Sequence, residues 1–224
     1  VFQEGVVAED GFFAVFDGHN GSECATYASV HLPICFVEVP NFKNKSPDEL
    51  MVEGYKSGTT AVCAHIAGKK KLCIGWCGDS GAALLRSTSK IKLCFLRVMD
   101  EGGFLIFING ELRVNGVLNI TRSLGDLSAG EAISSVPSTL TVDLDGSEYL
   151  LILGSDGLYD AFDGKDLFDR VEKFVKSRPA KDYNELSRYL CREASEEGSC
   201  DNITAICVFL RPVEDLWKLF CSSH

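Results

Sequence analysis

No apolar run in the 224-residue sequence approaches the roughly 18 residues that a helix needs to span a bilayer. The first residues, Val1 to Glu4, have neither the positive charge nor the small-residue cleavage site of a secretory signal peptide. Repeats, linkers and low-complexity tracts are also absent. We therefore expect a soluble protein of the cytoplasm or nucleus, with one substantial core and no membrane partner.

Basic residues are in the minority. Lys and Arg together number 22, against 32 Asp and Glu, and the formal net charge is −10. A protein that binds nucleic acid needs a basic surface to face the phosphates, so nucleic acid is not expected as a partner. An acidic surface suits a protein that collects cations, although acidic surfaces also simply keep proteins in solution.

The sequence contains no Cys-x-x-Cys pair, so a zinc ribbon or a redox motif finds no support. The ten cysteines lie mostly inside apolar or helical segments. Thiols in such segments behave as small hydrophobic side chains. We expect all of them to be reduced.

Apolar segments separated by short polar turns predict strands, and segments with one apolar face predict helices. The expected strands are 12–16, 61–66, 71–75, 82–86, 91–96, 140–142, 149–154 and 203–209. The expected helices are 22–31, 166–177, 183–197 and 213–220. Short connections favour antiparallel pairing. The pattern predicts an α+β fold in which antiparallel sheets pack together and helices lie outside them.

One short pattern recurs along the chain: an apolar strand meets Gly or Ser beside an aspartate. It is seen in FFAVFDGHNG, IGWCGDSGAALL, NITRSLGDL, YLLILGSDGLYD and EGSCDNITAICVF. A lone Asp-Gly at a strand end is most often a turn. Scattered turns do not usually repeat this pattern, so the aspartates are candidates for one shared site. They are Asp17, Asp79, Asp126, Asp156, Asp160 and Asp201.

Carboxylates without cysteine, and with few histidines, form a hard oxygen site that suits Mg²⁺ or Mn²⁺ better than zinc. Several carboxylates that converge repel one another unless cations neutralise them. Two close metal ions can activate a water and hold a phosphoryl group for attack. A glycine such as Gly18 permits close backbone approach, so its carbonyl is a further candidate ligand. The residues therefore indicate an acidic, metal-binding hydrolase, with phosphate esters as candidate substrates.

Six ordered blocks resemble the signature blocks of the metal-dependent type 2C Ser/Thr protein phosphatases. They are FFAVFDGHNG, SGTTAV, CGDSGAALL, VNGVLNITRSLGD, LLILGSDGLYDAF and GSCDNITAICVFL, and they run from Phe12 to Leu210. The resemblance implies an antiparallel β-sandwich flanked by α-helices, as one catalytic domain over 1–224. It also implies Mn²⁺ or Mg²⁺ ions in a channel at one edge, a phosphoprotein substrate and a monomer that can have a protein partner.

The resemblance assigns metal ligands position by position. Asp17 matches the carboxylate that bridges two metal ions, and Gly18 matches the residue that offers its backbone carbonyl. Asp156 and Asp201 match the remaining ligands of that pair. Asp79 matches an aspartate that, with Asp156, holds a weaker third ion.

The same blocks imply a proton donor. His19 matches the general acid that protonates the leaving alkoxide. Arg122, Asp126 and Asp160 lie in neighbouring blocks, and only supporting roles are implied for them. Arg122 has the alternative of simply pairing with a nearby carboxylate.

Two family blocks are not matched. The family has an Arg and a Glu well upstream of the first strand, but only sixteen residues precede Asp17, and Glu9 and Asp10 lie too close to that strand. The stretch that normally precedes Glu101-Gly102-Gly103 is also missing. Either the sequence omits an N-terminal segment and an internal loop, or the chain is a pseudophosphatase that binds partners and hydrolyses nothing. A different metal-dependent hydrolase, such as a nuclease, is disfavoured by the charge and by the block order.

Overall fold

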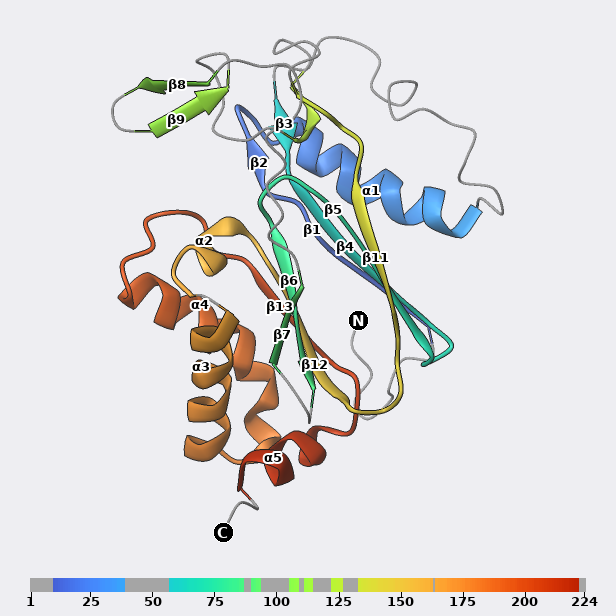
Figure 1. Ribbon diagram of the computed structural model, residues 1–224, viewed down its shortest axis with the longest axis vertical. Helices are drawn as coiled ribbons and strands as arrows, with labels where there is room; N and C mark the ends of the chain where they lie inside the picture. Colours follow the sequence, from blue (N-terminus) through green and yellow to red (C-terminus); the bar gives the residue numbers. More distant parts are fainter. Residues whose placement is uncertain are drawn as a thin grey trace.

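The computed structural model describes residues 10–38, 57–86, 90–93, 105–108, 111–114, 122–126, 133–162 and 164–221. Two four-stranded antiparallel sheets form its centre, with strand orders β1-β4-β5-β11 and β13-β12-β6-β7 (Figure 1). The first sheet contains β1 (Gly11–Val15), β4 (Ala61–Ala67), β5 (Lys71–Cys77) and β11 (Ser138–Asp143). The second contains β13 (Ala205–Phe209), β12 (Glu148–Gly154), β6 (Gly81–Arg86) and β7 (Lys90–Leu93).

Helices cover the second sheet on the face turned away from the first. They are α2 (Asp156–Tyr159), α3 (Gly164–Ser177), α4 (Leu186–Glu196) and α5 (Val213–Cys221). The remaining elements are α1 (Glu23–Glu38), the 3₁₀ helix η4 (Ala180–Glu185), and the short strands β2 (Gly18–His19), β3 (Gly58–Thr59), β8 (Leu105–Ile108), β9 (Glu111–Val114) and β10 (Leu124–Gly125). This arrangement confirms the predicted α+β fold with packed antiparallel sheets.

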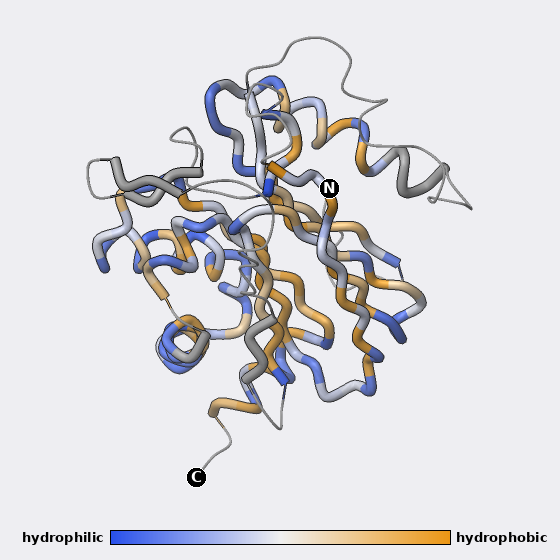
Figure 2. Tube along the Cα trace, turned by 45° about the horizontal axis from the view of Figure 1, so that its top comes forward, coloured by the Kyte–Doolittle hydropathy of each residue, from blue (hydrophilic) through white to orange (hydrophobic). Residues whose placement is uncertain are grey.

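Two hydrophobic cores meet at β12, because successive side chains of a strand point to opposite faces. Leu151 and Leu153 face the first sheet and join a core between the two sheets. Leu150 and Ile152 face the helices and join a second core with side chains such as Phe168 of α3. A strand that is covered on both faces reads as one continuous apolar run, as residues 149–154 do. Figure 2 shows the strands coloured mostly as hydrophobic and many of the turns at their ends as hydrophilic.

The hairpin of β4 and β5 has the predicted antiparallel pairing, with Val62 opposite Trp76. A short turn joins the two strands, and the Lys70 N–H donates to the Ala67 carbonyl there at 3.0 Å. Gly68 and Lys69 occupy the centre of this turn with φ of 55° and 54°, the left-handed region that tight hairpins require.

Several element ends differ from the sequence prediction. The segment predicted as one helix over 183–197 splits into η4, which follows Pro179, and then α4. Helix α1 continues beyond residue 31 and includes Pro33, which removes one helical hydrogen bond without ending the helix. Strand β13 begins at Ala205 rather than at 203, because the backbone of Thr204 hydrogen-bonds to Ser155 instead of to a neighbouring strand. Residues 94–96 of the predicted strand 91–96 lie outside the described residues.

Eight cysteines in the described part of the chain are free thiols, as predicted: Cys24, Cys63, Cys73, Cys77, Cys191, Cys200, Cys207 and Cys221. Burial raises the pKa of Cys63, Cys77 and Cys207 to about 12, so these thiols stay protonated and unreactive. Within the part of the chain that the structure describes, none of the helices has the length and apolar character that a bilayer crossing demands.

The core beneath the helices yields a stability prediction. Phe168 is fully buried, so Phe168→Ala removes a large apolar side chain and leaves a cavity. We expect this change to lower the free energy of unfolding by about 3–5 kcal/mol. Urea denaturation measures the change, with Val136→Ala as a control because Val136 is 67% exposed. A loss no larger than that of the control would show that this core is not tightly packed.

Candidate metal centre

The direction of the strands in the first sheet brings two predicted ligands to one end of the sandwich. Strands β1 and β5 are both antiparallel to β4, so they run in the same direction and end at the same edge. Val15 pairs with Val62 and Cys77 pairs with Ala61 at that edge. Asp17 and Asp79, which follow these two strands, therefore lie at the same end of the sheet.

The second sheet adds the other two carboxylates at this end. Gly154, the last residue of β12, pairs with Gly81 at the start of β6 and with Ala205 at the start of β13. Asp156 follows that end of β12, and Asp201 precedes β13. Because residues 78–80 join β5 of the first sheet to β6 of the second, the two edges belong to the same end of the sandwich.

Hydrogen bonds hold the loop of Asp17 next to the loop of Asp79. The Thr60 N–H donates to the Asp17 carbonyl at 2.9 Å. The hydroxyl groups of Thr60 and Ser80 lie 2.6 Å apart. Gly78 adopts φ 96°, and a Cβ there would come within 2.7 Å of the Thr60 side chain. This turn therefore depends on glycine, both for its backbone conformation and for its close packing.

A second set of bonds joins the loop of Asp156 to that of Asp201. The Ser155 hydroxyl donates to the Asn202 carbonyl at 3.0 Å and accepts from the Thr204 N–H at 3.0 Å. A Cβ on Gly157 would lie 2.7 Å from the Asn202 carbonyl oxygen, so the two loops approach as closely as glycine allows. Sequence reasoning missed Ser155, because a lone serine has no spacing pattern that reveals a contact 47 residues away.

The electrostatics show that the four carboxylates act on one another. The pKa of Asp17 is raised to about 6, and burial is the largest cause. The charge of Asp156, a hydrogen bond with its side chain, and the charges of Asp201 and Asp79 all contribute to the same rise. Burial also raises the pKa of Asp156, and the charge of Asp201 adds to this effect. Like charges that share a poorly hydrated site favour protonation of one of them.

The donor set fits a hard divalent cation. Four carboxylates offer only oxygen ligands, and a cation among them would replace their repulsion by attraction. Gly18 is exposed in β2 beside Asp17, where its backbone is accessible. Among the residues that the structure describes, however, no three carboxylate, histidine or cysteine side chains form a preformed metal-binding cluster. The ligand roles of the four aspartates and Gly18 stay predictions.

His19 lies next to these carboxylates and contacts a different aspartate. Its Nε2 is 2.6 Å from Oδ2 of Asp126, and the Asp126 side chain is only 2% exposed. The Ser123 hydroxyl donates to the same carboxylate oxygen. Sequence reasoning selected His19 and Asp126 separately and missed both their contact and the part played by Ser123.

The other two supporting residues lie at the edge of the site. The Arg122 guanidinium donates to the Ser138 hydroxyl at 2.7 Å, and its backbone bridges to Ser134. The Asp160 N–H donates to the Asp156 carbonyl at 2.7 Å at the end of α2, and its charge contributes to the raised pKa of Asp156. Their supporting roles in catalysis stay predictions.

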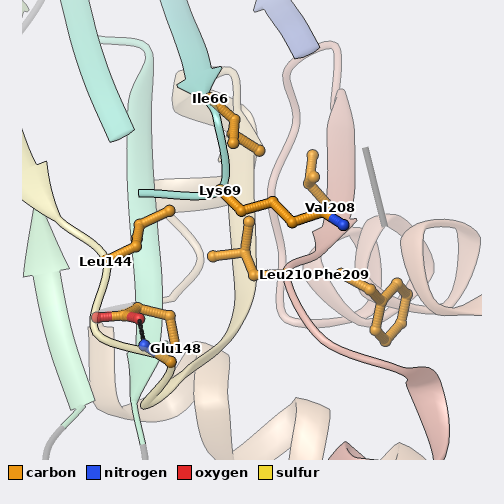
Figure 3. A pocket seen from close by; sticks show the side chains of 8 residues that line it. Ile66, Lys69, Leu144, Glu148, Val208, Phe209 and Leu210 are labelled. Carbon is orange, nitrogen blue, oxygen red and sulfur yellow. Dashed lines mark hydrogen bonds between the residues drawn. The ribbon is translucent and has the colours of Figure 1, made fainter. Parts of the chain in front are cut away.

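A small cavity of about 60 Å³ lies at the opposite end of the sandwich, close to the turn between β4 and β5 (Figure 3). Its lining is mostly apolar, and the Glu148 carboxylate there accepts a hydrogen bond from the Gly146 N–H. The cavity is remote from the strand-end aspartates, and none of them lines it. The lining residues are Ile66, Lys69, Leu144, Gly146, Glu148, Val208, Phe209 and Leu210.

Comparison with known proteins defines the class to which this fold and site belong. The family model described as Protein phosphatase 2C matches residues 3–203. The chain therefore belongs to the protein phosphatase 2C family, as the six sequence blocks predicted.

Two relatives match this chain over part of their own length. Protein phosphatase fem-2 of Caenorhabditis elegans is 40% identical over 235 aligned positions, which cover 92% of this chain and 52% of that protein. Protein phosphatase 1E of Mus musculus is 33% identical over 228 positions, which cover 91% of this chain and 30% of that protein. The chain thus spans about half of the first relative and less of the second.

Solved structures confirm the fold. A structure described as that of a C. elegans sex determining protein superimposes with a TM-score of 0.85 at 38% identity, covering 94% of this chain and 59% of that chain. The serine-threonine phosphatase 2C from Toxoplasma gondii has a TM-score of 0.73 at 18% identity, covering 90% and 85%. The second likeness shows the shared fold alone.

The raised pKa of Asp17 predicts how metal-free stability depends on pH. A carboxyl group whose pKa is higher in the folded state than in the unfolded state adds stability that is fully present below the unfolded pKa of 3.8 and is lost as the pH rises through the folded pKa of about 6. Among the neighbouring charges, that of Asp156 raises the pKa of Asp17 the most, and Asp156→Asn removes it. We therefore expect this variant to stabilise the metal-free protein more at about pH 7 than at about pH 5, as measured by urea denaturation in chelator. An equal effect at both pH values would mean that the two carboxylates are not coupled.

Proposed function

We propose that this protein is a Mn²⁺- or Mg²⁺-dependent protein phosphatase that hydrolyses phosphoserine and phosphothreonine in protein substrates. The observation that carries the proposal is the meeting of four mutually repelling carboxylates from both sheets at one end of the sandwich. Membership of the protein phosphatase 2C family supports it. We further propose that the enzyme acts as a monomer on phosphoproteins in the cytoplasm or nucleus.

The proposed mechanism divides the work between cations and side chains. Asp17, Asp156 and Asp201, with the Gly18 carbonyl, would hold two cations, and Asp79 with Asp156 would hold a weaker third. When bound, such cations supply a water nucleophile at neutral pH and neutralise charge on the transferring phosphoryl group. The aspartates fix where that charge is neutralised, because their loops are tied to the ends of rigid strands.

His19 would act on the leaving group of the reaction. A serine or threonine alkoxide is a poor leaving group, so its oxygen must gain a proton as the P–O bond breaks. The His19 side chain is 24% exposed, which leaves it accessible to a substrate while its Nε2 is held by Asp126. In this role the imidazole donates a proton to the leaving oxygen.

A second candidate function is a pseudophosphatase scaffold. The observation that favours it is that the described residues contain no preformed three-ligand cluster. A scaffold would keep the two sheets and the helices and use the surface of the domain to bind a protein partner. The two candidates differ in whether divalent cations bind and in whether phosphate is released.

Asp156→Asn tests the metal site, because it keeps the size of the side chain and removes the charge that a hard cation requires. In an active phosphatase Mn²⁺ should raise the melting temperature of the wild type, since a ligand that binds only the native state stabilises it. Asp156→Asn should show a much smaller rise and no phosphatase activity, and yet stay folded. Paired melts with and without Mn²⁺, beside a phosphopeptide assay on the full-length protein, measure both effects.

Asp145→Asn is the matched control, because Asp145 lies in an exposed turn where it accepts a hydrogen bond from the Ser147 N–H. It should melt and react like the wild type. A wild type that neither gains melting temperature with Mn²⁺ nor releases phosphate from phosphopeptides would overturn the enzyme and leave the scaffold.

His19→Gln tests the general acid. Loss of the proton donor should lower kcat on phosphoserine peptides by about a hundred- to ten-thousandfold, and much less on aryl phosphates, whose phenolate leaves without a proton. Steady-state kinetics on both substrates measure the difference. His31→Gln is the control, because His31 stacks on Tyr27 in α1, away from the site. An equal drop on both substrates would assign His19 a structural role instead.

A further inference from the structure

The side chains of His19 and Asp126 meet across β3, the middle strand of a small sheet. In the small sheet β10-β3-β2, His19 lies opposite Gly58 of β3, and Gly58 lies opposite Gly125 of β10. The imidazole therefore reaches over the middle strand to meet the carboxylate of the residue that follows Gly125. The two side chains meet at 2.6 Å although they are 107 residues apart in the sequence.

Gly58 makes this reach possible. A Cβ at position 58 would overlap both the Asp126 carboxylate and the Nε2 atom of His19. The hydrogen bond thus occupies the space that a side chain on the middle strand would fill. A glycine in a strand often marks a site where another group approaches the backbone closely.

Asp126 is itself held rigidly. Its carboxylate accepts from the Ser123 hydroxyl, and its N–H donates to the Ser57 carbonyl at 3.2 Å. Its backbone has φ 53°, the left-handed region that only a few residue types, aspartate among them, adopt readily. A buried carboxylate fixed by backbone conformation and by two bonds presents one oxygen to His19 in a constant direction.

We propose that Asp126 is the positioning residue of the general acid, an inference that rests on the proposed function. A carboxylate can only accept a hydrogen bond, so Nε2 of His19 must carry a hydrogen and donate it. The hydrogen bond made by one ring nitrogen sets the role of the other. Nδ1 is thereby assigned as the nitrogen that gives its proton to the substrate.

The proton balance of the step follows from this assignment. As water attacks phosphorus, the bond from phosphorus to the serine or threonine oxygen breaks, and the proton on Nδ1 moves to that oxygen. His19 is left neutral, with its remaining hydrogen still on Nε2 and still donated to Asp126. Solvent then returns a proton to Nδ1 before the next turnover.

The kinetic test uses Asp126→Gly, because glycine accepts the positive φ at this position whereas alanine would add strain. If Asp126 acts through His19, this variant should lose about ten- to a hundredfold in kcat on phosphoserine peptides, with little change in KM and a smaller loss on aryl phosphates. Asp126→Asn should restore the rate only in part, since its amide keeps an oxygen that accepts from Nε2 but can also donate and no longer fixes the tautomer.

The double variant separates positioning from a structural role. Residues that act as one unit have non-additive effects. We therefore expect His19→Gln combined with Asp126→Gly to be no slower than His19→Gln alone. Asp145→Gly carries the same chemical change in an exposed turn and should match the wild type. Losses that multiply in the double variant would overturn the positioning role.

A second readout needs neither activity nor metal. In ¹⁵N-histidine-labelled, metal-free protein in mildly alkaline buffer, where an ordinary imidazole is neutral, His19 should carry its hydrogen on Nε2. The sequence has four histidines, and His19→Gln identifies the signal by its loss. In Asp126→Gly the signal should shift towards a mixture of the two tautomers. A wild-type spectrum with the hydrogen on Nδ1 would contradict the proposal, even if Asp126→Gly failed to fold.

The proposed phosphatase activity and the positioning role of Asp126 can fail separately in these experiments. A wild type that shows no phosphatase activity overturns the proposed function, and with it the catalytic role given to Asp126. The role of Asp126 alone is overturned if the wild type is active but the losses of kcat in His19→Gln and Asp126→Gly multiply in the double variant. It is overturned likewise if His19 of an active wild type carries its hydrogen on Nδ1. An active wild type with a non-additive double variant and the hydrogen on Nε2 supports both.

Discussion

Electrostatic repulsion among the aspartates at one end of the sandwich is the constraint on which the arrangement of the site depends. Burial and the neighbouring charges raise the pKa of Asp17 to about 6, so near neutral pH its charged form is held at a cost in free energy. Unconstrained loops would lower this cost in free energy by moving their aspartates away from one another. Here each aspartate follows or precedes a strand whose register is set by the sheet, and the loops cannot separate without breaking that pairing.

Hydrogen bonds made by small polar residues hold the loops of the repelling aspartates in fixed positions. Ser155 bonds to the loop after Asp201, and Thr60 bonds both to Asp17 and to Ser80 beside Asp79. These bonds are made by backbone groups and hydroxyls, which carry no net charge. They therefore hold like charges close together without neutralising them, and a cation is left as the group that can do so. The His19–Asp126 pair follows the same principle, because Ser123 and a left-handed backbone fix the carboxylate.

The long elements could be predicted from the sequence because their side chains repeat with the period of a strand or helix over many residues. The continuous apolar run of β12 and the polar turn after β4 are examples, and both are confirmed. The two-residue strands β2, β3 and β10 are too short to show a period, so the sheet that joins His19 to Asp126 could not be predicted. The aspartates stood out by a repeated local pattern. Ser155, Thr60 and Gly58 did not, because their importance lies in contacts between distant segments.

The residues that hold the fold are different from those that would perform the chemistry. Neither hydrophobic core contains any of the strand-end aspartates, and the larger core lies beneath α3, α4 and α5. A member of the family that lost its metal ligands would keep both cores, and relief of the repulsion would favour its folded state. Membership of the family and catalytic activity are therefore physically separable in this molecule. Stabilisation by a cation acts only through the strand-end carboxylates, so it reports on the site independently of the cores that define the fold.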